Sequence, residues 1–442
     1  MKPMKNGILY LVVLILFGLS QNCIAQEKKY VLLISIDGLR PDFYLEDTWN
    51  TPILKGLKEN GVYSKGINSV FPSVTYPSHT TLVTGSFPAT HGVLYNSPRN
   101  AEDANHWYWE FSRIQTSTLW QAAQDKGLET GAVMWPVTVG APITYNFPVR
   151  RPYGKEKGNQ LSVTEPVVTP PTLMPRLKKE GIITSQSQFE HDAVDGTIGA
   201  MATYIIEQHT PALMAVHFIN VDHMQHVYGR DDEHVKQAIE NVDMQIGKLI
   251  NALKDKGIYN QTDIIVTGDH GHVDVNKVFL PNLPLKKAGL ITDNEEKAHF
   301  VTAGGAAFLY VQDKKYGVQV KKILASLPAK QRDVFTIYNK KQLDEIGADP
   351  EAYLAIGMKK GYVANQKTTG SIIQDKKPVA AHGFYPSFKE IQTGFIMSGP
   401  DVAAHGEIKA AMGIQDIAPI ISKLLDLGFK SKNGKLHKEF LK

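Results

Sequence analysis

Residues 30–40 read YVLLISIDGLR, a continuous apolar run that ends in Asp37 and Gly38. Valine, leucine and isoleucine without polar alternation are typical of a strand that is buried on both faces of a parallel sheet. Three later runs have the same character: residues 213–219 (LMAVHFI), 263–267 (DIIVT) and 393–398 (TGFIMS). Together these runs predict the core of one sheet.

Helical periodicity separates these strands. Residues 233–256 place apolar side chains on one helical face, and residues 416–425 carry Pro419 in a first turn, where proline is tolerated. Alternation of strands and helices predicts an α/β fold with a mostly parallel central sheet and helices on both faces. The more polar span 275–377 predicts a smaller α+β inserted lobe, and the proline- and lysine-rich span 148–179 predicts a surface loop.

The composition is that of a globular protein. The chain has 442 residues, 43% hydrophobic and 21% charged, which excludes collagen-like, coiled-coil and wholly disordered chains. A formal charge of +4 excludes a strongly basic nucleic-acid-binding surface, so no nucleic-acid duplex is expected as a partner. The single cysteine, Cys23, excludes a disulfide framework and a cysteine-rich zinc site. Any metal must therefore be held by histidines and carboxylates.

The first 25 residues have the pattern of a secretory signal. Lys2 and Lys5 precede the apolar residues 8–19, and Ala25 is a small residue at the expected cleavage point. Cleavage would leave residues 26–442 as the mature chain, with a charge of +2 instead of +4, exported to the periplasm or secreted. An uncleaved anchor is the alternative, but a membrane span needs roughly 20 apolar residues. A lipid anchor at Cys23 is a third reading.

Acids and histidines follow the predicted strands. Such positions are the usual source of active sites in open α/β sheets. Each residue alone has an ordinary reading as a turn residue, a helix cap or a packed histidine. Their joint occurrence gives three carboxylates and three imidazoles, the right chemistry for two Zn²⁺ ions. The set is Asp37, Asp222, His226, Asp269, His270 and His382.

Residues 71–85 (FPSVTYPSHTTLVTG) add a hydroxyl to this set. Pro77 is placed to open a helix to Thr84, which puts Thr75 just before a helix N-terminus, where anions are favoured. A hydroxyl beside a metal can ionise and attack phosphorus. The alternative is that Thr75 is only a helix cap, and Ser73 or Ser78 would serve equally well as the hydroxyl.

At these residues the chain resembles the nucleotide pyrophosphatase/phosphodiesterase family of the alkaline phosphatase superfamily. The similarity extends in order over roughly residues 30 to 430, and several independent motifs in order are much stronger than one. The matching segments are residues 36–40 (IDGLR), 71–77 (FPSVTYP), 85–92 (GSFPATHG), Asn96, Trp135-Pro136, 222–226 (DHMQH), 268–271 (GDHG) and 382–384 (HGF).

The resemblance implies an alkaline-phosphatase-like fold and two zinc sites. One site would use Asp222, His226 and His382. The other would use Asp37, Asp269, His270 and the oxygen of Thr75, the family's nucleophile.

Three further roles follow from the same resemblance. Asn96 would donate to a phosphoryl oxygen, with the backbone N–H of Tyr76 as a further donor. The Tyr76 ring takes the place of an aromatic residue that helps to form a substrate pocket. Trp135 is a second candidate for that pocket, with ordinary core packing as its alternative.

The sequence departs from the family pattern at three places. Ser78 follows Pro77 where asparagine is usual, His272 follows Gly271 where methionine is common, and Tyr385-Pro386 stands where Tyr-Asp-Asn is frequent. None of these removes a ligand or the nucleophile. They concern substrate preference.

The resulting hypothesis is zinc-dependent hydrolysis of phosphodiester or pyrophosphate bonds in nucleotides, through a phosphothreonine intermediate on Thr75. Superfamily monoesterases bring a cation to the phosphoryl group, and only Arg150, Arg151 and Lys155 are candidates here, in a predicted loop. The alternatives are a periplasmic alkaline phosphatase acting on monoesters, a phosphonate hydrolase, and a non-catalytic zinc-containing binding protein.

Overall fold

The computed structural model describes residues 28–185, 187, 189, 194–403 and 405–442. The predicted signal segment 1–25, with Cys23, lies outside these residues. Within them, no helix combines the length and the apolar character needed to cross a membrane.

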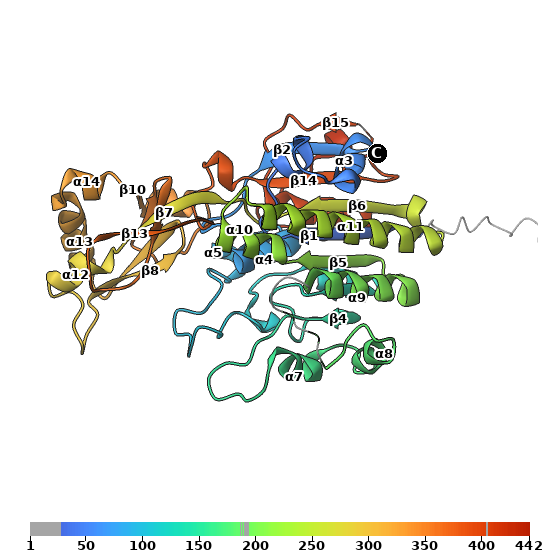
Figure 1. The fold of residues 1–442 in the computed structure, drawn as a ribbon, viewed down its shortest axis with the longest axis horizontal. Coiled ribbons are helices and arrows are strands. Elements are labelled where there is room, and N and C mark those ends of the chain that lie inside the picture. Colours follow the sequence, from blue (N-terminus) through green and yellow to red (C-terminus); the bar gives the residue numbers. More distant parts are fainter. Residues whose placement is uncertain (1–27, 186, 188, 190–193, 404) are drawn as a thin grey trace, which may run out of the picture.

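An eight-stranded sheet forms the centre of the molecule (Figure 1). Five neighbouring strands, β6-β1-β5-β3-β4, run parallel, and only β14 pairs antiparallel with its neighbours. The predicted, mostly parallel sheet is thus confirmed. In sheet order the strands are β15 (Gly406–Glu407), β2 (Val62–Ile67), β14 (Thr393–Ser398), β6 (Thr262–Thr267), β1 (Tyr30–Ile36), β5 (Leu213–Phe218), β3 (Thr130–Val133) and β4 (Tyr145–Phe147).

Helices cover both faces of this sheet. Along β1, Leu32, Ile34 and Ile36 belong to one hydrophobic cluster, whereas Val31 and Leu33 belong to another on the opposite face. The first cluster packs against α3 (Pro52–Glu59), α8 (Leu173–Lys179), α9 (Val194–His209), α10 (Asn220–Tyr228) and α11 (Glu233–Asp255). The second packs against α4 (Thr75–Thr84), α6 (Leu119–Asp125) and α16 (Ile417–Leu424).

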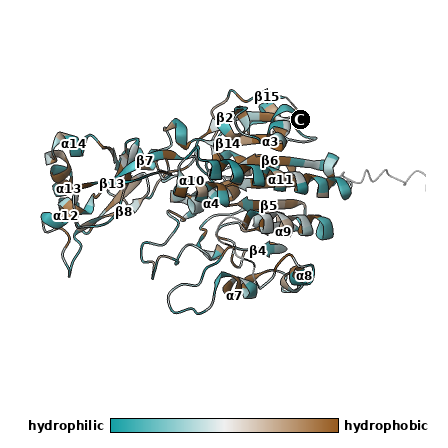
Figure 2. Ribbon diagram, in the orientation of Figure 1, coloured by the Kyte–Doolittle hydropathy of each residue, from teal (hydrophilic) through white to brown (hydrophobic). Residues whose placement is uncertain are grey.

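Burial on both faces explains the unbroken apolar runs of the sequence. Every residue of β1, β5 and β6 is buried. Full burial of one Leu, Ile or Val side chain contributes about 1.5–3 kcal/mol. The apolar colours of Figure 2 accordingly gather in the interior, while the outer ends of α9 and α11 carry hydrophilic colours.

Two smaller sheets stand beside the carboxyl ends of the parallel strands (Figure 1). The antiparallel four-stranded sheet consists of β10 (Phe335–Asn339), β11 (Leu354–Met358), β9 (Ala306–Val311) and β8 (Ala298–Ala303). The three-stranded sheet consists of β12 (Gly361–Ala364), β7 (Val273–Phe279) and β13 (Ile373–Ala381). Their helices are α12 (Asn282–Lys287), α13 (Lys314–Ser326), α14 (Ala329–Arg332) and α15 (Lys340–Glu345). A separate lobe over residues 275–377 stays a prediction.

The predicted loop over residues 148–179 is wrong in part, because it contains two short helices. They are α7 (Gln160–Thr164) and α8. Asn159 caps α7 through a hydrogen bond from the Ser162 N–H, and α8 buries Leu173, Met174 and Leu177 against the core. The proline and lysine content of this span predicted a loop, although α8 has an amphipathic pattern whose apolar side packs against the core. The remaining short helices are α2 (Asp42–Leu45) and α5 (Pro88–His91).

Candidate active site

Three carboxylates meet where adjacent parallel strands end. Asp37 follows β1, Asp269 follows β6 after Gly268, and Asp222 lies in the first turn of α10, directly after β5. Because β6, β1 and β5 are neighbours in the sheet, their carboxyl ends bring these acids to one edge. The Asp37 N–H continues the sheet pairing by donating to the Phe218 carbonyl at 2.8 Å.

The position of Asp222 depends on a buried acid in α9. Asp195 accepts hydrogen bonds from the backbone N–H groups of Ile219 (2.9 Å) and Asn220 (3.3 Å), at the start of α10. Burial raises the pKa of Asp195 to about 6. Asp195 therefore anchors the turn that presents Asp222.

The small three-stranded sheet brings in imidazoles. Ala381, the last residue of β13, pairs with Val273, the first residue of β7, so His382 and His272 lie beside each other. The His382 Nδ1–H donates to the Ser73 carbonyl at 2.9 Å. On α10, the His226 Nδ1–H donates to the Ala380 carbonyl at 3.0 Å. A backbone acceptor on Nδ1 leaves Nε2 as the metal-binding nitrogen.

The first candidate metal-binding group consists of Asp37, Asp269 and His270, and is called the carboxylate cluster below. One oxygen of each acid is held: Asp37 Oδ2 lies 3.2 Å from His217 Nε2, and Asp269 Oδ1 accepts from the Gly38 N–H at 3.0 Å. The other oxygens face the shared space, with His270 Nε2 3.5 Å from Asp37 Oδ1 and 3.1 Å from Asp269 Oδ2.

The second group, called the imidazole cluster below, consists of Asp222, His270, His272 and His382. Asp222 Oδ1 lies 3.0 Å from His272 Nε2 and 3.7 Å from His382 Nε2. The predicted ligand His226 is not among these four, although its Nε2 is 3.3 Å from Asp222 Oδ1; its side chain is 37% exposed and stands at the rim. All six predicted Asp and His ligands thus lie together.

Buried polar atoms in both clusters fit a metal. Five of the converging atoms are buried and have no hydrogen-bond partner among the described residues: Asp37 Oδ1, Asp222 Oδ1, Asp269 Oδ2, His270 Nε2 and His272 Nε2. Buried polar groups in native proteins are almost always paired. Carboxylate oxygens and imidazole nitrogens are also the ligands that zinc prefers in the absence of cysteine. The donor set and its lack of internal partners therefore suit two bound cations.

The two clusters differ in electrostatics. Burial and the charge of Asp222 raise the pKa of Asp37 well above its ordinary value, and burial and Asp37 do the same for Asp269. The pKa of Asp222 moves in the opposite direction. Burial by itself would raise this pKa, but His226 and His272 hold it well below the ordinary value. Burial lowers the pKa of His382 to about 3 and that of His272 to about 4. These imidazoles are neutral at physiological pH, the form that binds metal.

Thr75 is the first residue of α4, two residues earlier than the predicted helix start. Pro77 is the third residue of the helix, still in the first turn. The Thr75 side chain is buried and lines the same pocket as Asp37. The alternative hydroxyls point elsewhere: Ser73 Oγ donates to the Phe384 carbonyl, and Ser78 Oγ pairs with Ser69 Oγ at 3.3 Å.

The Asn96 side chain contacts the backbone of Tyr76, the residue that follows Thr75. The Tyr76 N–H donates to Asn96 Oδ1 at 3.0 Å, so this amide is occupied by Asn96. Its donation to a phosphoryl oxygen stays a prediction. This bond fixes the orientation of the Asn96 side chain and leaves its NH₂ group able to donate.

A pocket of about 240 Å³ opens beside Thr75, with Asp37 and Asp222 at its base. Tyr76 forms its wall, with edge-to-face contacts to Trp107 (ring centroids 5.1 Å apart) and Trp109 (5.8 Å). Trp135 is fully buried in the hydrophobic cluster beneath α4, and its neighbours Met134 and Pro136 line the pocket instead. The structure favours the core-packing reading of Trp135.

Two buried histidines behind the site were not predicted. His79 accepts from Ser35 Oγ (2.9 Å) and donates from Nδ1 to the Thr75 carbonyl (2.8 Å). His217, in the middle of β5, contacts Asp37 and donates from Nδ1 to the Met134 carbonyl at 3.0 Å. The only sequence signal for His217 was its position as a titratable residue inside an otherwise apolar strand. The signal for His79 was its position four residues after Thr75.

Comparison with known proteins agrees with this geometry. Residues 31–384 match the type I phosphodiesterase / nucleotide pyrophosphatase family. The chain belongs to this family of hydrolases. The family resemblance inferred from the sequence motifs is confirmed.

Curated relatives are ectonucleotide pyrophosphatase/phosphodiesterases. Mouse family member 7 is 25% identical over 262 residues, which cover 57% of this chain and 52% of that protein, about half its length. Human family member 5 is 22% identical over 423 residues, covering 92% of this chain and 76% of the relative. The bovine bis(5'-adenosyl)-triphosphatase ENPP4 is 25% identical over 288 residues, covering 62% and 55%.

Solved structures share the fold. Murine ectonucleotide pyrophosphatase/phosphodiesterase 5, in an inactive form in complex with AMP, superposes with a TM-score of 0.65 at 21% identity. The superposition covers 94% of this chain and 100% of that chain. The human counterpart gives a TM-score of 0.64 over 93% of this chain and 100% of that chain, also at 21% identity.

Proposed function

We propose that this protein hydrolyses phosphodiester or pyrophosphate bonds of nucleotides, with two Zn²⁺ ions as cofactors and Thr75 as the nucleophile. The observation that carries the proposal is the position of Thr75, the first residue of α4, in one pocket with Asp37 and Asp222, an acid of each cluster. The fitting ligands are Asp37, Asp269, His270 and Thr75 for one ion, and Asp222, His226 and His382 for the other.

Bound zinc would supply Lewis acidity, which lowers the pKa of a neighbouring hydroxyl and withdraws charge from a phosphoryl group. The chain's own residues provide orientation. Asp37 lines the pocket beside Thr75, and the His79 Nδ1–H donates to the Thr75 carbonyl, which fixes the start of α4. The attack of Thr75 Oγ1 on phosphorus forms phosphothreonine and releases one half of the substrate. A water then cleaves the phosphothreonine.

Asn96 is proposed as the donor that stabilises the phosphoryl oxygens. Its Oδ1 is occupied by the Tyr76 N–H, so its NH₂ group donates. The α4 N-terminus adds a partial positive charge on the same side. A fixed donor aimed at developing negative charge needs no reorganisation during the reaction.

The pocket supports a nucleotide as substrate class. Tyr76 and the half-buried Trp107 offer aromatic surface on which a base can stack. Of the described residues that line the pocket, only Arg151 carries a permanent positive charge, with its guanidinium 5.7 Å from the Trp107 ring centroid. The bovine relative is named for a dinucleoside triphosphate, and the murine structure holds AMP, which supports the same class.

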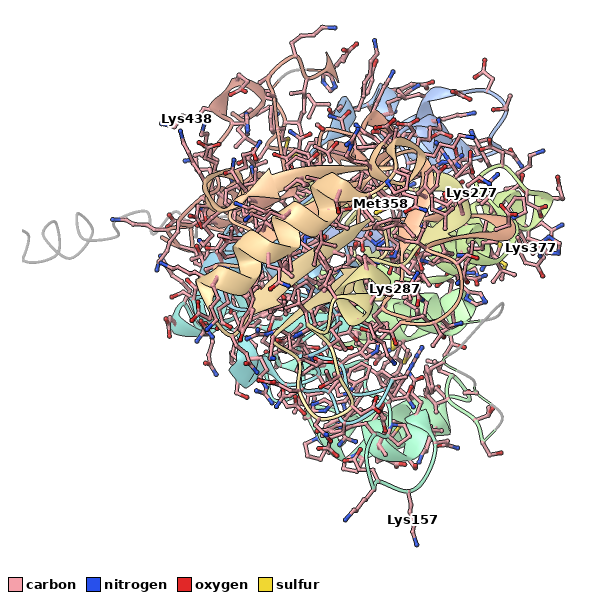
Figure 3. The ribbon with its side chains drawn as sticks, turned by 90° about the vertical axis from the view of Figure 1, so that its left-hand side faces the viewer. Lys157, Lys277, Lys287, Met358, Lys377 and Lys438 are labelled. Atoms are coloured by element: carbon pink, nitrogen blue, oxygen red, sulfur yellow. The ribbon has the colours of Figure 1, made fainter. Side chains whose placement is uncertain are left out.

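Lysines such as Lys157, Lys377 and Lys438 lie in separate directions around the outline (Figure 3). The formal charge of the whole chain is only +4. Recognition of an anionic substrate is therefore assigned to the clusters and Arg151. Export to the periplasm or the exterior, after cleavage of residues 1–25, is part of the same proposal and rests on the sequence pattern.

Substitution of the nucleophile tests the mechanism. Thr75→Ala is expected to abolish turnover of bis(p-nitrophenyl) phosphate while zinc content, measured by atomic absorption, stays at the wild-type level. Ser78→Ala removes a hydroxyl from the same helix that faces Ser69 instead of the site, and should keep activity within a few-fold. Normal turnover by the Thr75→Ala variant would refute the nucleophile assignment.

Substrate comparison tests the reaction class. The zinc-loaded protein is expected to hydrolyse bis(p-nitrophenyl) phosphate faster than p-nitrophenyl phosphate. A strong preference for the monoester would indicate an alkaline phosphatase, and a preference for a phosphonate ester would indicate a phosphonate hydrolase. Inactivity with all three, despite bound zinc, would indicate a binding protein.

A further inference from the structure

His272 stands inside the imidazole cluster without a role in the proposed reaction. It directly precedes β7 and is fully buried. Its Nε2 is 3.0 Å from Asp222 Oδ1, yet neither atom has a hydrogen-bond partner among the described residues. Two buried atoms that approach each other without bonding face a common space. A cation there would contact both.

The distances around Asp222 fit coordination by one ion. Zinc bonds to nitrogen and oxygen are about 2.0–2.1 Å, so the ligand atoms of a tetrahedral ion lie roughly 3.3 Å apart. From Asp222 Oδ1, the Nε2 atoms of the three nearby imidazoles are at 3.0 Å (His272), 3.3 Å (His226) and 3.7 Å (His382). His272 therefore lies nearer to the expected ligand spacing than His382 does, and His226 matches that spacing best.

The three rings are also nearly equally spaced from one another. Their centroids are 5.0 Å apart for His226 and His272, 4.9 Å for His226 and His382, and 5.4 Å for His272 and His382. Space for the His272 ring depends on Gly38, where a Cβ atom would come within 2.7 Å of His272 Cε1. The Asp37-Gly38 turn thus leaves room for this imidazole.

A purely space-filling role would explain why the His272 ring is buried, but it would not explain why a ring with two polar nitrogens is used there. Neither ring nitrogen of His272 has a hydrogen-bond partner among the described residues. Burial of unpaired polar atoms costs free energy that an apolar side chain would avoid. His226 and His382 each pair Nδ1 with a backbone carbonyl. A bound metal would give His272 Nε2 the partner that it lacks.

We propose that His272 is a direct ligand of the ion at Asp222, together with His226 and His382. The inference rests on the proposed function only in requiring that this ion binds. One carboxylate and three imidazoles form a nitrogen-rich set, which favours Zn²⁺ or Co²⁺ over Mn²⁺ or Mg²⁺. His272 thereby sets the metal preference of this half of the site.

The test counts ligating histidines directly. Protein with ¹⁵N-labelled imidazoles is loaded with ¹¹³Cd²⁺ as a zinc substitute, and each ligating nitrogen shows a cadmium coupling in its NMR resonance. His272→Met and His272→Gln are each expected to remove one coupled histidine from the wild-type set. His299→Met removes a half-exposed histidine of β8 and should leave the set unchanged. An unchanged set in both His272 variants overturns the proposal.

Affinity gives a second measurement. Loss of a supporting group outside the coordination shell costs 10–100-fold in metal affinity, so loss of a direct ligand should weaken Zn²⁺ binding at one of the two sites by more than about 100-fold. Competition with a chelator measures this, and equal affinities in wild type and His272→Gln overturn the proposal. Equal apo melting temperatures establish that the variants are folded.

Turnover separates this inference from the proposed function. Wild-type protein that shows the His272 coupling but hydrolyses no phosphoester would refute the proposed function and uphold the ligand. Protein that hydrolyses diesters while His272 shows no coupling would uphold the proposed function and refute His272 as a ligand.

Discussion

The two candidate metal-binding clusters of the site differ in their electrostatics. In the carboxylate cluster, burial and the charge of Asp222 raise the pKa of Asp37, and burial and the charge of Asp37 raise the pKa of Asp269, so a bound cation would relieve an unfavourable arrangement of charge. In the imidazole cluster a single acid, Asp222, is stabilised by its histidines, which lower its pKa. The difference teaches that similar ligands from the same sheet edge acquire opposite electrostatic roles from their neighbours.

Metal removal should have the largest effect. Treatment with a chelator is expected to reduce diester hydrolysis by at least about 1,000-fold, since a bound metal supplies several kcal/mol of transition-state stabilisation. Zn²⁺ should restore full activity and Mn²⁺ only part of it, because nitrogen-rich ligand sets disfavour Mn²⁺. Equal recovery with both metals would show that the two halves do not differ in metal preference.

Loss of Asn96 comes next. Asn96→Ala should lower kcat by about 100–1,000-fold with little change in KM, as expected for the loss of a donor to a developing charge. Asn105→Ala, in an exposed part of the same loop region, is the control and should behave as wild type. A change in KM alone would place Asn96 in substrate binding and remove charge stabilisation from the Thr75 side.

The pocket predicts a smaller effect that depends on the substrate. Trp107→Ala should raise KM for a dinucleotide by about 5–100-fold, since stacking of a base on an aromatic ring is worth about 1–3 kcal/mol. Hydrolysis of methyl p-nitrophenyl phosphate, which has no base, serves as the control and should change little. Equal losses for both substrates would mean that Trp107 supports the Tyr76 wall instead of contacting a base.

Two substitutions in the metal-free protein test the electrostatic contrast itself. Asp37→Asn should stabilise the apo protein by about 0.5–2 kcal/mol at about pH 8, because it removes a carboxylate that burial and the charge of Asp222 make unfavourable. The pKa of Asp37 is raised in the folded state. The destabilisation caused by this residue therefore grows as pH rises above the ordinary carboxyl pKa, and it vanishes near pH 4. Denaturant unfolding at both pH values measures this.

Asp222→Asn should have the opposite effect on the stability of the apo protein. The pKa of Asp222 is lowered in the folded state, so its contribution is present above the ordinary carboxyl value and is lost as pH falls through the folded value. The apo variant is expected to be less stable by about 1–2 kcal/mol at about pH 7. The same sign for both variants would contradict the proposed difference between the halves.

Much of the site could be predicted because its residues follow strands that are recognisable locally. The unbroken run 30–36 corresponds to β1, and Asp37 follows it at the sheet edge. The adjacency of β6, β1 and β5 then brings Asp37, Asp222 and Asp269 together. Trp135 and the Tyr76 amide could not be assigned in this way, because burial and hydrogen bonding depend on contacts with residues distant in the chain.

By itself, the sequence determined the α/β class, the order of acids and histidines, and Thr75 at a helix start, since apolar periodicity and turn residues act over short distances. Only the tertiary structure decided that His272 belongs with Asp222, and that His217 supports Asp37. His272 meets His382 through the pairing of Val273 with Ala381, residues more than a hundred positions apart. Such pairing is set by the packing of whole sheets, which no local pattern records.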